Sequence, residues 1–239
     1  MPALAIVSPH PDDAVLSLWH VLTAPEEVMV VNLFGGSPDG HRGDAWWDRL
    51  TGAEDSVARV RERHAEDRAA LALAGREPVD LGFLDGQYRT AAPAPEELAA
   101  GLDAAVPAGT PLLAPAALDA HRDHVAARDA ALALRAGGRE VRLYADVPHC
   151  TVYGWPAWVT GEAPDPFLRP ESRWEDTMRE TGVSLAACTP DVRRLDEAAL
   201  TAKAEAVRAY RSQLPALEAQ FGVMRPAVLG HEVTWALPA

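Results

Sequence analysis

The chain has 239 residues, of which 48% are hydrophobic, and its formal net charge is −13 at pH 7. This length suits one large domain with a sizeable core. The acidic balance argues against nucleic acid or an anionic membrane as partner, and no apolar run approaches the roughly 18 residues of a membrane helix. Because the start lacks a signal-peptide pattern, we expect a cytoplasmic protein whose two cysteines, Cys150 and Cys188, are buried and reduced.

The first predicted element is a buried strand over residues 3–7, which ends where two prolines interrupt the apolar run. His10, Asp12 and Asp13 follow directly. Ligands bind at the carboxyl ends of strands in open α/β sheets, so this cluster of metal-compatible side chains predicts a metal-dependent hydrolase site. The alternative is a turn in which one aspartate only caps the following helix, predicted over residues 14–22.

A second buried strand is predicted over residues 28–34. The segment 37–51 is polar and rich in glycine, which indicates an ordered loop near the strand ends. Trp46 and Trp47 lie in this loop, and such loops often carry substrate contacts. A long helix rich in Ala, Arg and Glu is predicted over residues 54–75, where a glycine ends it.

A third strand is predicted over residues 79–84, and Asp85 begins the turn that follows it. The next elements are a helix over residues 96–106 and a short strand near Leu112. This strand leads into a second group of polar residues.

Two histidines in that group, His121 and His124, lie in the first turn of a helix predicted to reach about Leu134. Their i, i+3 spacing puts both on one helix face, where they can share a metal or a substrate. Taken alone, such a pair is usually just solvated. A catalytic zinc site takes three protein ligands and leaves one position for water. His10, Asp13 and one of the two later histidines would supply that set.

A further strand is predicted over residues 140–145, before a stretch rich in proline and tryptophan. Its aromatic rings could form a sugar-stacking wall, but we favour the alternative that they fill the core. His149 is best explained as a hydrogen-bonded structural histidine. A helical pattern over residues 195–221 is interrupted at Pro215, and residues 231–237 alternate like a terminal edge strand.

Strand and helix patterns alternate along the chain, which predicts an α/β fold, a Rossmann-like three-layer sandwich with a mostly parallel sheet. We expect a single domain over residues 1–239, with a core over about 3–150 and a C-terminal helical and edge-strand elaboration over about 151–239. No dinucleotide-binding motif, P-loop or serine-hydrolase elbow occurs. The Rossmann-like arrangement is therefore expected to be a scaffold only, without nucleotide binding or serine-hydrolase chemistry.

The motif His-Pro-Asp-Asp at residues 10–13, with His121 and His124 downstream, resembles the LmbE-like, or PIG-L, family of zinc-dependent N-deacetylases and amidases. The resemblance covers roughly residues 3–221. Many members carry glutamate where this chain has Ala14, which leaves the subfamily and the substrate open. Further similar segments occur in the same order: Arg63-x-x-Glu66, Leu81-Gly82-Phe83-Leu84-Asp85-Gly86 and Tyr210-Arg211-Ser212-Gln213.

The resemblance implies that His10, Asp13 and His124 bind zinc and that Asp12 is the general base. A carboxylate that does not bind the metal is free to accept a proton from water, whose pKa zinc lowers toward ~7. Attack on an amide carbonyl builds an oxyanion that needs a further donor. We expect His121, as an imidazolium, to be that donor and later to protonate the leaving amine.

Three further residues each have two interpretations. Asp123 either fixes the tautomer of one imidazole or is a first-turn carboxylate favoured by the helix macrodipole. Arg63 either contacts a polar substrate, as the resemblance implies, or forms an exposed ion pair with Glu66 or Asp67. Asp85 is either a turn former or a partner of sugar hydroxyls, and the resemblance favours the second.

These inferences predict a zinc enzyme that removes an N-acyl group, above all N-acetyl, from an amino-sugar-like or natural-product small molecule. Fe²⁺, Co²⁺ or Mn²⁺ could occupy the same N/O site. One alternative is an amidase that acts on a larger thiol or natural-product conjugate. Another is a metal-free inactive relative that binds small molecules or acts as a scaffold, although the intact motifs argue against it.

Overall fold

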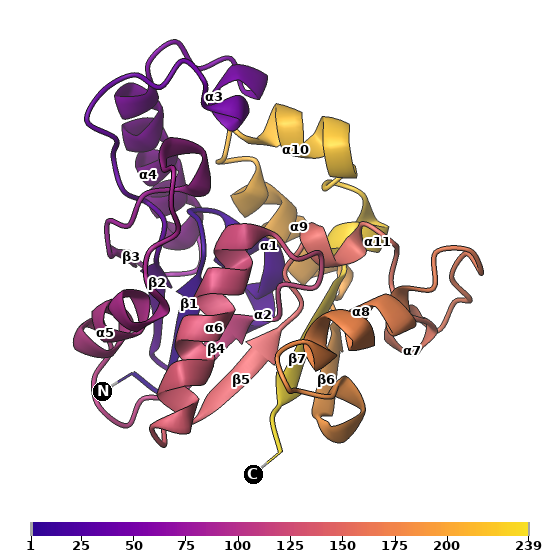
Figure 1. Ribbon diagram of the computed structural model, residues 1–239. Helices are drawn as coiled ribbons and strands as arrows, with labels where there is room; N and C mark the ends of the chain where they lie inside the picture. Colours follow the sequence, from indigo (N-terminus) through magenta and orange to yellow (C-terminus); the bar gives the residue numbers. More distant parts are fainter. Residues whose placement is uncertain (1, 239) are drawn as a thin grey trace.

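The computed structural model describes residues 2–238, in which a seven-stranded sheet runs through the middle of the molecule (Figure 1). The strands are β1 Leu4–Ser8, β2 Val28–Asn32, β3 Pro78–Asp80, β4 Leu112–Pro115, β5 Val141–Tyr144, β6 Thr189–Arg194 and β7 His231–Ala236. Their order in the sheet is β3-β2-β1-β4-β5-β7-β6. The first five are parallel, whereas β7 runs antiparallel to both β5 and β6.

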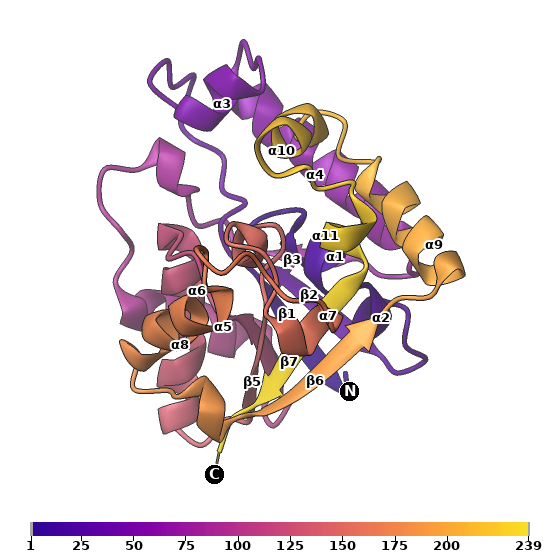
Figure 2. The ribbon, with the colours of Figure 1, turned by 90° about the vertical axis from the view of Figure 1, so that its right-hand side faces the viewer.

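Helices cover both faces of this sheet, as Figures 1 and 2 show, so the predicted three-layer α/β fold is confirmed. Within the described residues, no helix has the length and apolar character needed to cross a membrane. The helices are α1 Asp13–Ser17, α2 Trp19–Leu22, α3 Trp46–Leu50, α4 Ser56–Ala72, α5 Pro95–Ala105, α6 Arg122–Ala136, α7 Ala157–Thr160, α8 Pro170–Arg179, α9 Glu197–Val207, α10 Leu214–Phe221 and α11 Pro226–Leu229, with 3₁₀ turns η1 Gly86–Tyr88, η2 His149–Thr151 and η3 Leu185–Ala187.

The two helical layers have different members. α5 packs on α6, and α6 packs on β4 and β5. On the other face α9 contacts α1, α2 and α4, and Figure 2 shows this group across the sheet from α5 and α6. The central strands β1, β2 and β4 are thus buried on both sides, which explains their nearly continuous apolar sequences.

The first strand ends in a strained turn. Ser8 Oγ accepts the backbone N–H of Ala14 at 3.2 Å and donates to the carbonyl of His10 at 2.7 Å. Within this tight turn Asp12 has a φ of 127°, a conformation that residues other than glycine rarely adopt. Such strain persists only where the surrounding structure holds it, and it is common at functional sites.

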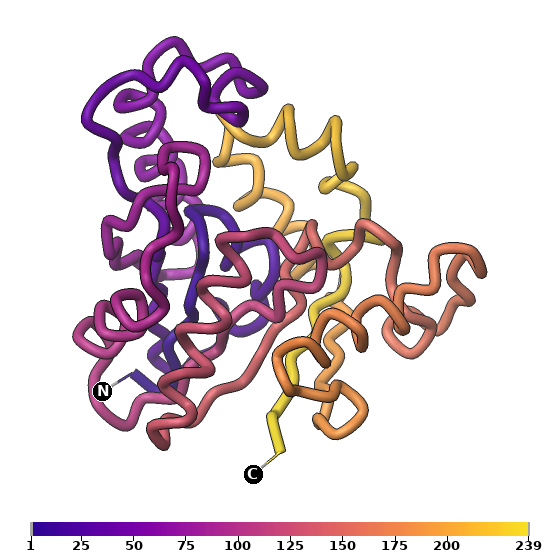
Figure 3. Tube along the Cα trace, viewed as in Figure 1, coloured from indigo at the N-terminus to yellow at the C-terminus, as the bar shows by residue number. Residues whose placement is uncertain are grey.

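The path of the chain between the strands can be followed in the tube trace of Figure 3. β1 pairs with β2 on one side and with β4 on the other, so the strand order reverses at β1. A crevice forms at such a switch point, outside the carboxyl ends of the strands. The segments that follow β1 and β4 therefore meet there, although more than 100 residues separate them in the sequence.

The C-terminal part differs from the sequence-based expectation. The helical pattern over residues 195–221 is two helices, because α9 ends at Val207 and α10 begins at Leu214. Pro215 lies in the first turn of α10, where its missing N–H costs no helical hydrogen bond. The prediction of a terminal edge strand at residues 231–237 was wrong in one respect. β7 lies inside the sheet, and the edge belongs to β6, whose exposed polar sequence lacks apolar alternation.

Smaller differences occur in the first half of the chain. The predicted loop 37–51 contains the short helix α3, and the predicted helix 14–22 divides into α1 and α2 at Leu18. The third strand is shorter than predicted, because β3 ends at Asp80. None of these differences moves the residues of the predicted site away from the sheet edge.

Two tryptophans of the tryptophan-rich stretch, Trp155 and Trp174, lie in the core as the sequence favours, whereas Trp158 is exposed. Trp174 is buried, and its ring lies 5.8 Å from that of Trp155 and 5.9 Å from that of Trp235. Both cysteines, Cys150 and Cys188, are buried and free, which confirms that expectation.

One buried ion pair attaches α9 to the sheet. Lys203, the only lysine of the chain, is fully buried, and its Nζ lies 2.7 Å from Glu232 Oε1 and 3.1 Å from the carbonyl of Leu229. Glu232 also accepts the backbone N–H of Trp19 at 2.8 Å and contacts the His20 ring. One carboxylate thus connects β7 with α9 and α2.

Candidate active site

Three side chains predicted as metal ligands converge at the carboxyl ends of β1 and β4. His10, Asp13 and His124 each offer one donor atom, and these atoms lie within 4.8 Å of one another. Asp13 Oδ2 is 3.3 Å from His10 Nδ1 and 3.3 Å from His124 Nε2. His124 Nε2 is buried and has no hydrogen-bond partner among the described residues. An orphaned buried nitrogen beside two further N/O donors fits a metal ion.

The second ring nitrogen of each histidine is hydrogen-bonded to a buried carboxylate. Asp123 Oδ2 lies 3.0 Å from His10 Nε2, and Asp146 Oδ2 lies 2.8 Å from His124 Nδ1. Carboxylates in this position fix the tautomer that leaves the other nitrogen free for a metal. The predicted hydrogen bond of Asp123 to one imidazole is present, while its effect on catalysis stays a prediction.

Asp123 is itself held by several groups. It is fully buried, accepts the backbone N–H of Gly86 at 2.8 Å and pairs with Arg89, whose guanidinium lies 4.7 Å above the Phe34 ring. Burial raises the pKa of this carboxyl, but the hydrogen bond of His10 and the charge of Arg89 outweigh burial and hold the pKa well below its usual range. Asp123 is therefore ionised at neutral pH.

Asp12 lies beside these ligands without joining the group of donor atoms. Its side chain is buried and lines the pocket described below. Burial and the negative charge of Asp13 raise the pKa of Asp12 to about 8, against the opposing charges of Arg63 and His10. A bound cation would oppose this rise. Such a carboxyl can exchange a proton near neutral pH, which is what a general base needs.

His121 caps the N-terminus of α6, and its Nδ1 accepts the backbone N–H of Asp123 at 3.4 Å. The sequence predicts an imidazolium here, but the structure favours the neutral ring. Burial and the charges of His10, His124 and His149 lower the pKa of His121 to about 3. With Nδ1 as acceptor, the proton of the neutral ring resides on Nε2, which remains a hydrogen-bond donor.

Arg63 and Asp85 form an ion pair beside the donor atoms, with Arg63 Nη1 3.1 Å from Asp85 Oδ2. The alternative pairing of Arg63 with Glu66 or Asp67 is absent from the ion pairs of the described residues. Asp85 fits both of its interpretations. Its Oδ1 accepts the backbone N–H of Gln87 at 3.0 Å, as in a turn, and its side chain also lines the pocket.

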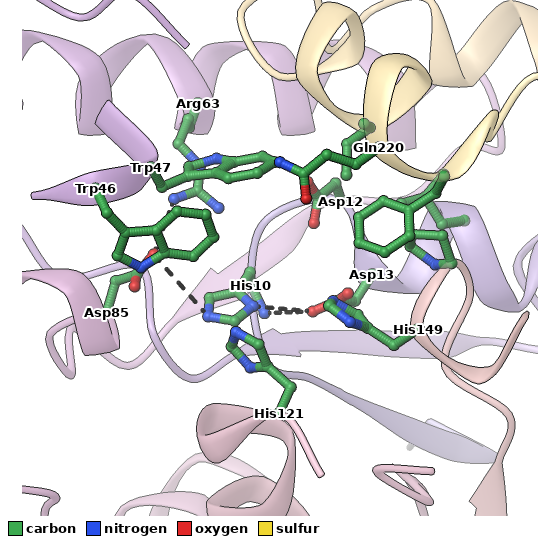
Figure 4. A pocket seen from close by; sticks show the side chains of 14 residues that line it. His10, Asp12, Asp13, Trp46, Trp47, Arg63, Asp85, His121, His149 and Gln220 are labelled. Carbon is green, nitrogen blue, oxygen red and sulfur yellow. Dashed lines mark hydrogen bonds and ion pairs between the residues drawn. The ribbon is translucent and has the colours of Figure 1, made fainter. Parts of the chain in front are cut away.

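A pocket opens above the predicted ligands (Figure 4). The close-up shows Trp46 and Trp47 on the side of Arg63 and Asp85, with Gln220 and His149 on the opposite side. The lining residues are His10, Asp12, Asp13, Leu16, Trp46, Trp47, Arg63, Asp85, His121, Pro148, His149, Leu217, Gln220 and Phe221.

The sequence model of the PIG-L family, described as GlcNAc-PI de-N-acetylase, matches residues 5–134, which are more than half of the chain. The chain belongs to the PIG-L family. This stretch contains every site residue predicted from the sequence, including Arg63 and Asp85. No curated protein matches the chain significantly.

Solved structures of deacetylases have the same fold as this PIG-L protein over nearly its whole length. A deacetylase triple mutant (Orf2*T) of the teicoplanin biosynthetic pathway is 26% identical, with a TM-score of 0.73 and coverage of 98% of this chain and 97% of that one. The A40926 pseudoaglycone deacetylase Dbv21 is 25% identical, with a TM-score of 0.69 and coverage of 100% and 99%. The likeness thus extends beyond the family model to the C-terminal half.

Two residues near the site were missed in the sequence. Asp146 holds His124, and the available signal was its place directly after β5, at the same sheet edge as the other polar groups. Arg89 holds Asp123 from a loop with no such signal. His149 is hydrogen-bonded to Asp119, as expected for a structural histidine, but its ring also lines the pocket.

Proposed function

We propose that this PIG-L protein is a zinc-dependent N-deacetylase, which removes an acetyl group from an amino sugar within a natural product. The main support is the donor set of His10, Asp13 and His124, with the free carboxylate of Asp12 beside it in an open pocket. The deacetylases among the solved structures support the same reaction class.

His10 Nδ1, Asp13 Oδ2 and His124 Nε2 would hold the metal. These two nitrogens and one oxygen suit zinc, and Fe²⁺, Co²⁺ or Mn²⁺ could occupy the same site. When bound, the cation supplies Lewis acidity for the amide carbonyl and for the attacking water. Asp123 and Asp146 keep the two imidazoles oriented toward it.

Asp12 would move the proton. Its carboxylate oxygen accepts a proton from water as the new bond to the amide carbon forms, and it then returns that proton to the leaving nitrogen. From its strained turn, Asp12 points into the pocket. The products are acetate and a free amine.

His121 would stabilise the negative charge that develops on the carbonyl oxygen. Its neutral ring donates from Nε2, since Nδ1 already accepts the N–H of Asp123. A fixed donor in a buried site lowers the barrier because no reorganisation is needed when the charge appears. Arg63 and Asp85 would bind the hydroxyls of the sugar.

Metal analysis of the purified protein, combined with an acetate-release assay on an N-acetylglucosamine glycoside, tests this proposal. We expect near-equimolar zinc in the wild type, none in the H10A/H124A variant, and acetate release from the first protein alone. A protein that binds no zinc after reconstitution, or that binds zinc and releases no acetate from any N-acetyl sugar, would overturn it.

A further inference from the structure

The Tyr-Arg-Ser-Gln segment at residues 210–213 has no part in the chemistry above, yet it is held tightly against α4. The Tyr210 hydroxyl donates to Asp67 Oδ1 at 2.7 Å. Ser212 donates twice to Glu66, from its backbone N–H at 2.8 Å and from its hydroxyl at 2.7 Å. The segment thus has a defined position relative to the helix that carries Arg63.

These contacts orient the fully buried amide of Gln213. The hydroxyl proton of Ser212 is used by Glu66, so Ser212 Oγ can only accept a hydrogen bond from Gln213 Nε2, which lies 2.7 Å away. The amide oxygen of Gln213 must then face the other way. There it accepts the indole N–H of Trp47.

This hydrogen bond joins two helices above the pocket. Trp47 belongs to α3, and Gln213 immediately precedes α10. Both helices line the pocket, α3 through Trp46 and Trp47 and α10 through Leu217 and Phe221. Figures 1 and 2 show the two helices next to each other above the sheet edge. Together they form a roof over the predicted metal ligands.

Trp46 is the unusual member of this roof, because its side chain is 47% exposed while it lines the pocket. Its ring stands edge-on to that of Trp47, with 5.3 Å between centroids. An exposed indole at a pocket gains free energy when a flat, weakly polar face covers it. In Figure 4 the Trp46 ring lies beside Asp85 and Arg63. The Nε of Arg63 is buried and has no hydrogen-bond partner among the described residues.

The two sides of the pocket therefore suit different parts of a substrate. An indole next to a charged pair matches a hydroxylated ring, which has apolar faces and polar edges. Apart from the polar groups of His149 and Gln220, the rest of the lining includes Leu16, Leu217 and Phe221, whose apolar atoms match an acyl group without hydroxyls. We propose that Gln213 is a positioning residue that holds the Trp46–Trp47 pair as the binding surface for the sugar ring on the amine side of the substrate.

This proposal rests on the proposed function, and its test compares two substrates. The phenyl glycoside of N-acetylglucosamine carries the ring, whereas N-acetylethanolamine has the same amide without one. The ratio of kcat/KM for the glycoside to kcat/KM for N-acetylethanolamine should fall about tenfold in W46A. This fall should come from a higher KM for the glycoside, because ring contacts are worth about that factor. Q213L and W47F should lower the ratio about fivefold. W158A, which removes a tryptophan of 39% exposure outside the pocket, should keep it.

Coupling separates a positioning role from a general structural one. Q213L and W47F remove the same hydrogen bond from opposite ends, so the double variant should lower the ratio no further than either single variant. Should Q213L not fold, W47F alone still carries the test. An unchanged ratio in both Q213L and W47F would overturn the role of Gln213, and an unchanged ratio in W46A would overturn the ring surface.

A binding measurement keeps this test separate from the proposed function. Phenyl β-glucosaminide, the amine product, should quench the tryptophan fluorescence of the wild type, and W46A should bind it about tenfold more weakly. This result is expected whether or not the protein turns over an amide. Equal binding by W46A and the wild type would contradict the proposal, even if deacetylation were observed.

Discussion

The floor and the roof of the pocket are built by different physical means. The floor consists of polar groups at the ends of β1 and β4, where the imidazoles of His10 and His124 are each held by a buried carboxylate. The roof consists of α3 and α10, which the hydrogen bond between Trp47 and Gln213 connects. Removing one partner of a buried charge pair costs much stability, whereas replacing one apolar side chain by another of similar volume costs less. We infer that the floor carries the chemistry and the roof carries the selection of substrate.

The family match does not follow this division. Residues 5–134 include the whole predicted ligand set and also α3, whereas α10 and Asp146 lie outside this range. The floor requires specific residue types at specific spacings, because few side chains can hold a metal or move a proton. The roof only needs a suitable shape and an apolar surface, which many sequences can supply. Of the four predictions below, ordered from the largest expected effect to the smallest, two test the floor and two test ion pairs that join helices to the sheet.

Replacement of Asp12 by Asn should have the largest effect. We expect kcat to fall by about 10²- to 10⁴-fold, because the amide cannot accept the proton. Zinc content should stay at the wild-type level, since Asp12 is outside the donor set. Steady-state kinetics with metal analysis checks both points, and D39N, at an exposed aspartate, is the matched control. A fully active D12N would remove Asp12 from the mechanism.

Replacement of Lys203 by Met tests the attachment of α9 to the sheet. The free energy of unfolding should fall by about 3–5 kcal/mol, because Glu232 would stay buried without its cation. Chemical denaturation measures this change. The double variant K203M/E232L should recover part of the loss, because it leaves no unpaired charge between α9 and β7. A K203M protein as stable as the wild type would show that the ion pair contributes nothing.

Replacement of Asp146 by Asn tests a residue of the floor that binds no metal itself. Zinc affinity should fall by about 10- to 100-fold, because the amide holds the His124 ring less firmly in the required tautomer. Competition with a chelating dye gives the dissociation constant. D119N is the matched control, since Asp119 holds His149 outside the donor set. Equal affinities in D146N and D119N would contradict the prediction.

Replacement of His64 by Gln should have the smallest effect and depend on pH. The hydrogen bond from His64 to Asp80, 3.0 Å apart, raises the pKa of His64 above its usual 6.5, although burial opposes this rise. Because the raised pKa belongs to the folded state, the stabilisation is complete below pH 6.5 and is lost as pH rises through the folded pKa. The wild type should therefore exceed H64Q in unfolding free energy more at pH 6 than at pH 9. A difference that grows with pH would contradict this sign.

Much of the site could be predicted from short stretches of sequence. His10, Asp12 and Asp13 share one turn after a buried strand, and His121 and His124 share the first turn of a helix. Backbone geometry over a few residues determines such arrangements. The α/β class was predictable for the same reason, because the spacing of apolar residues that distinguishes a strand from a helix is a local property of the sequence.

Pairings between distant segments were not predictable in this way. The sequence predicted that Asp123 could hydrogen-bond one imidazole, but only packing shows that this imidazole belongs to His10, 113 residues away. Arg63 finds Asp85 rather than its helical neighbours. The pKa of His121 was not predictable either, because it depends on three other imidazoles that only the fold brings close.

The sequence by itself determined which residue types could perform the chemistry and at which ends of strands and helices they lie, because spacing and backbone constraints act locally. Only the tertiary structure decided the partners: Asp146 for His124, Gln213 for Trp47, and β7 between β5 and β6. These choices depend on how elements far apart in the chain pack together, and on which buried polar atoms must find a partner once water is excluded.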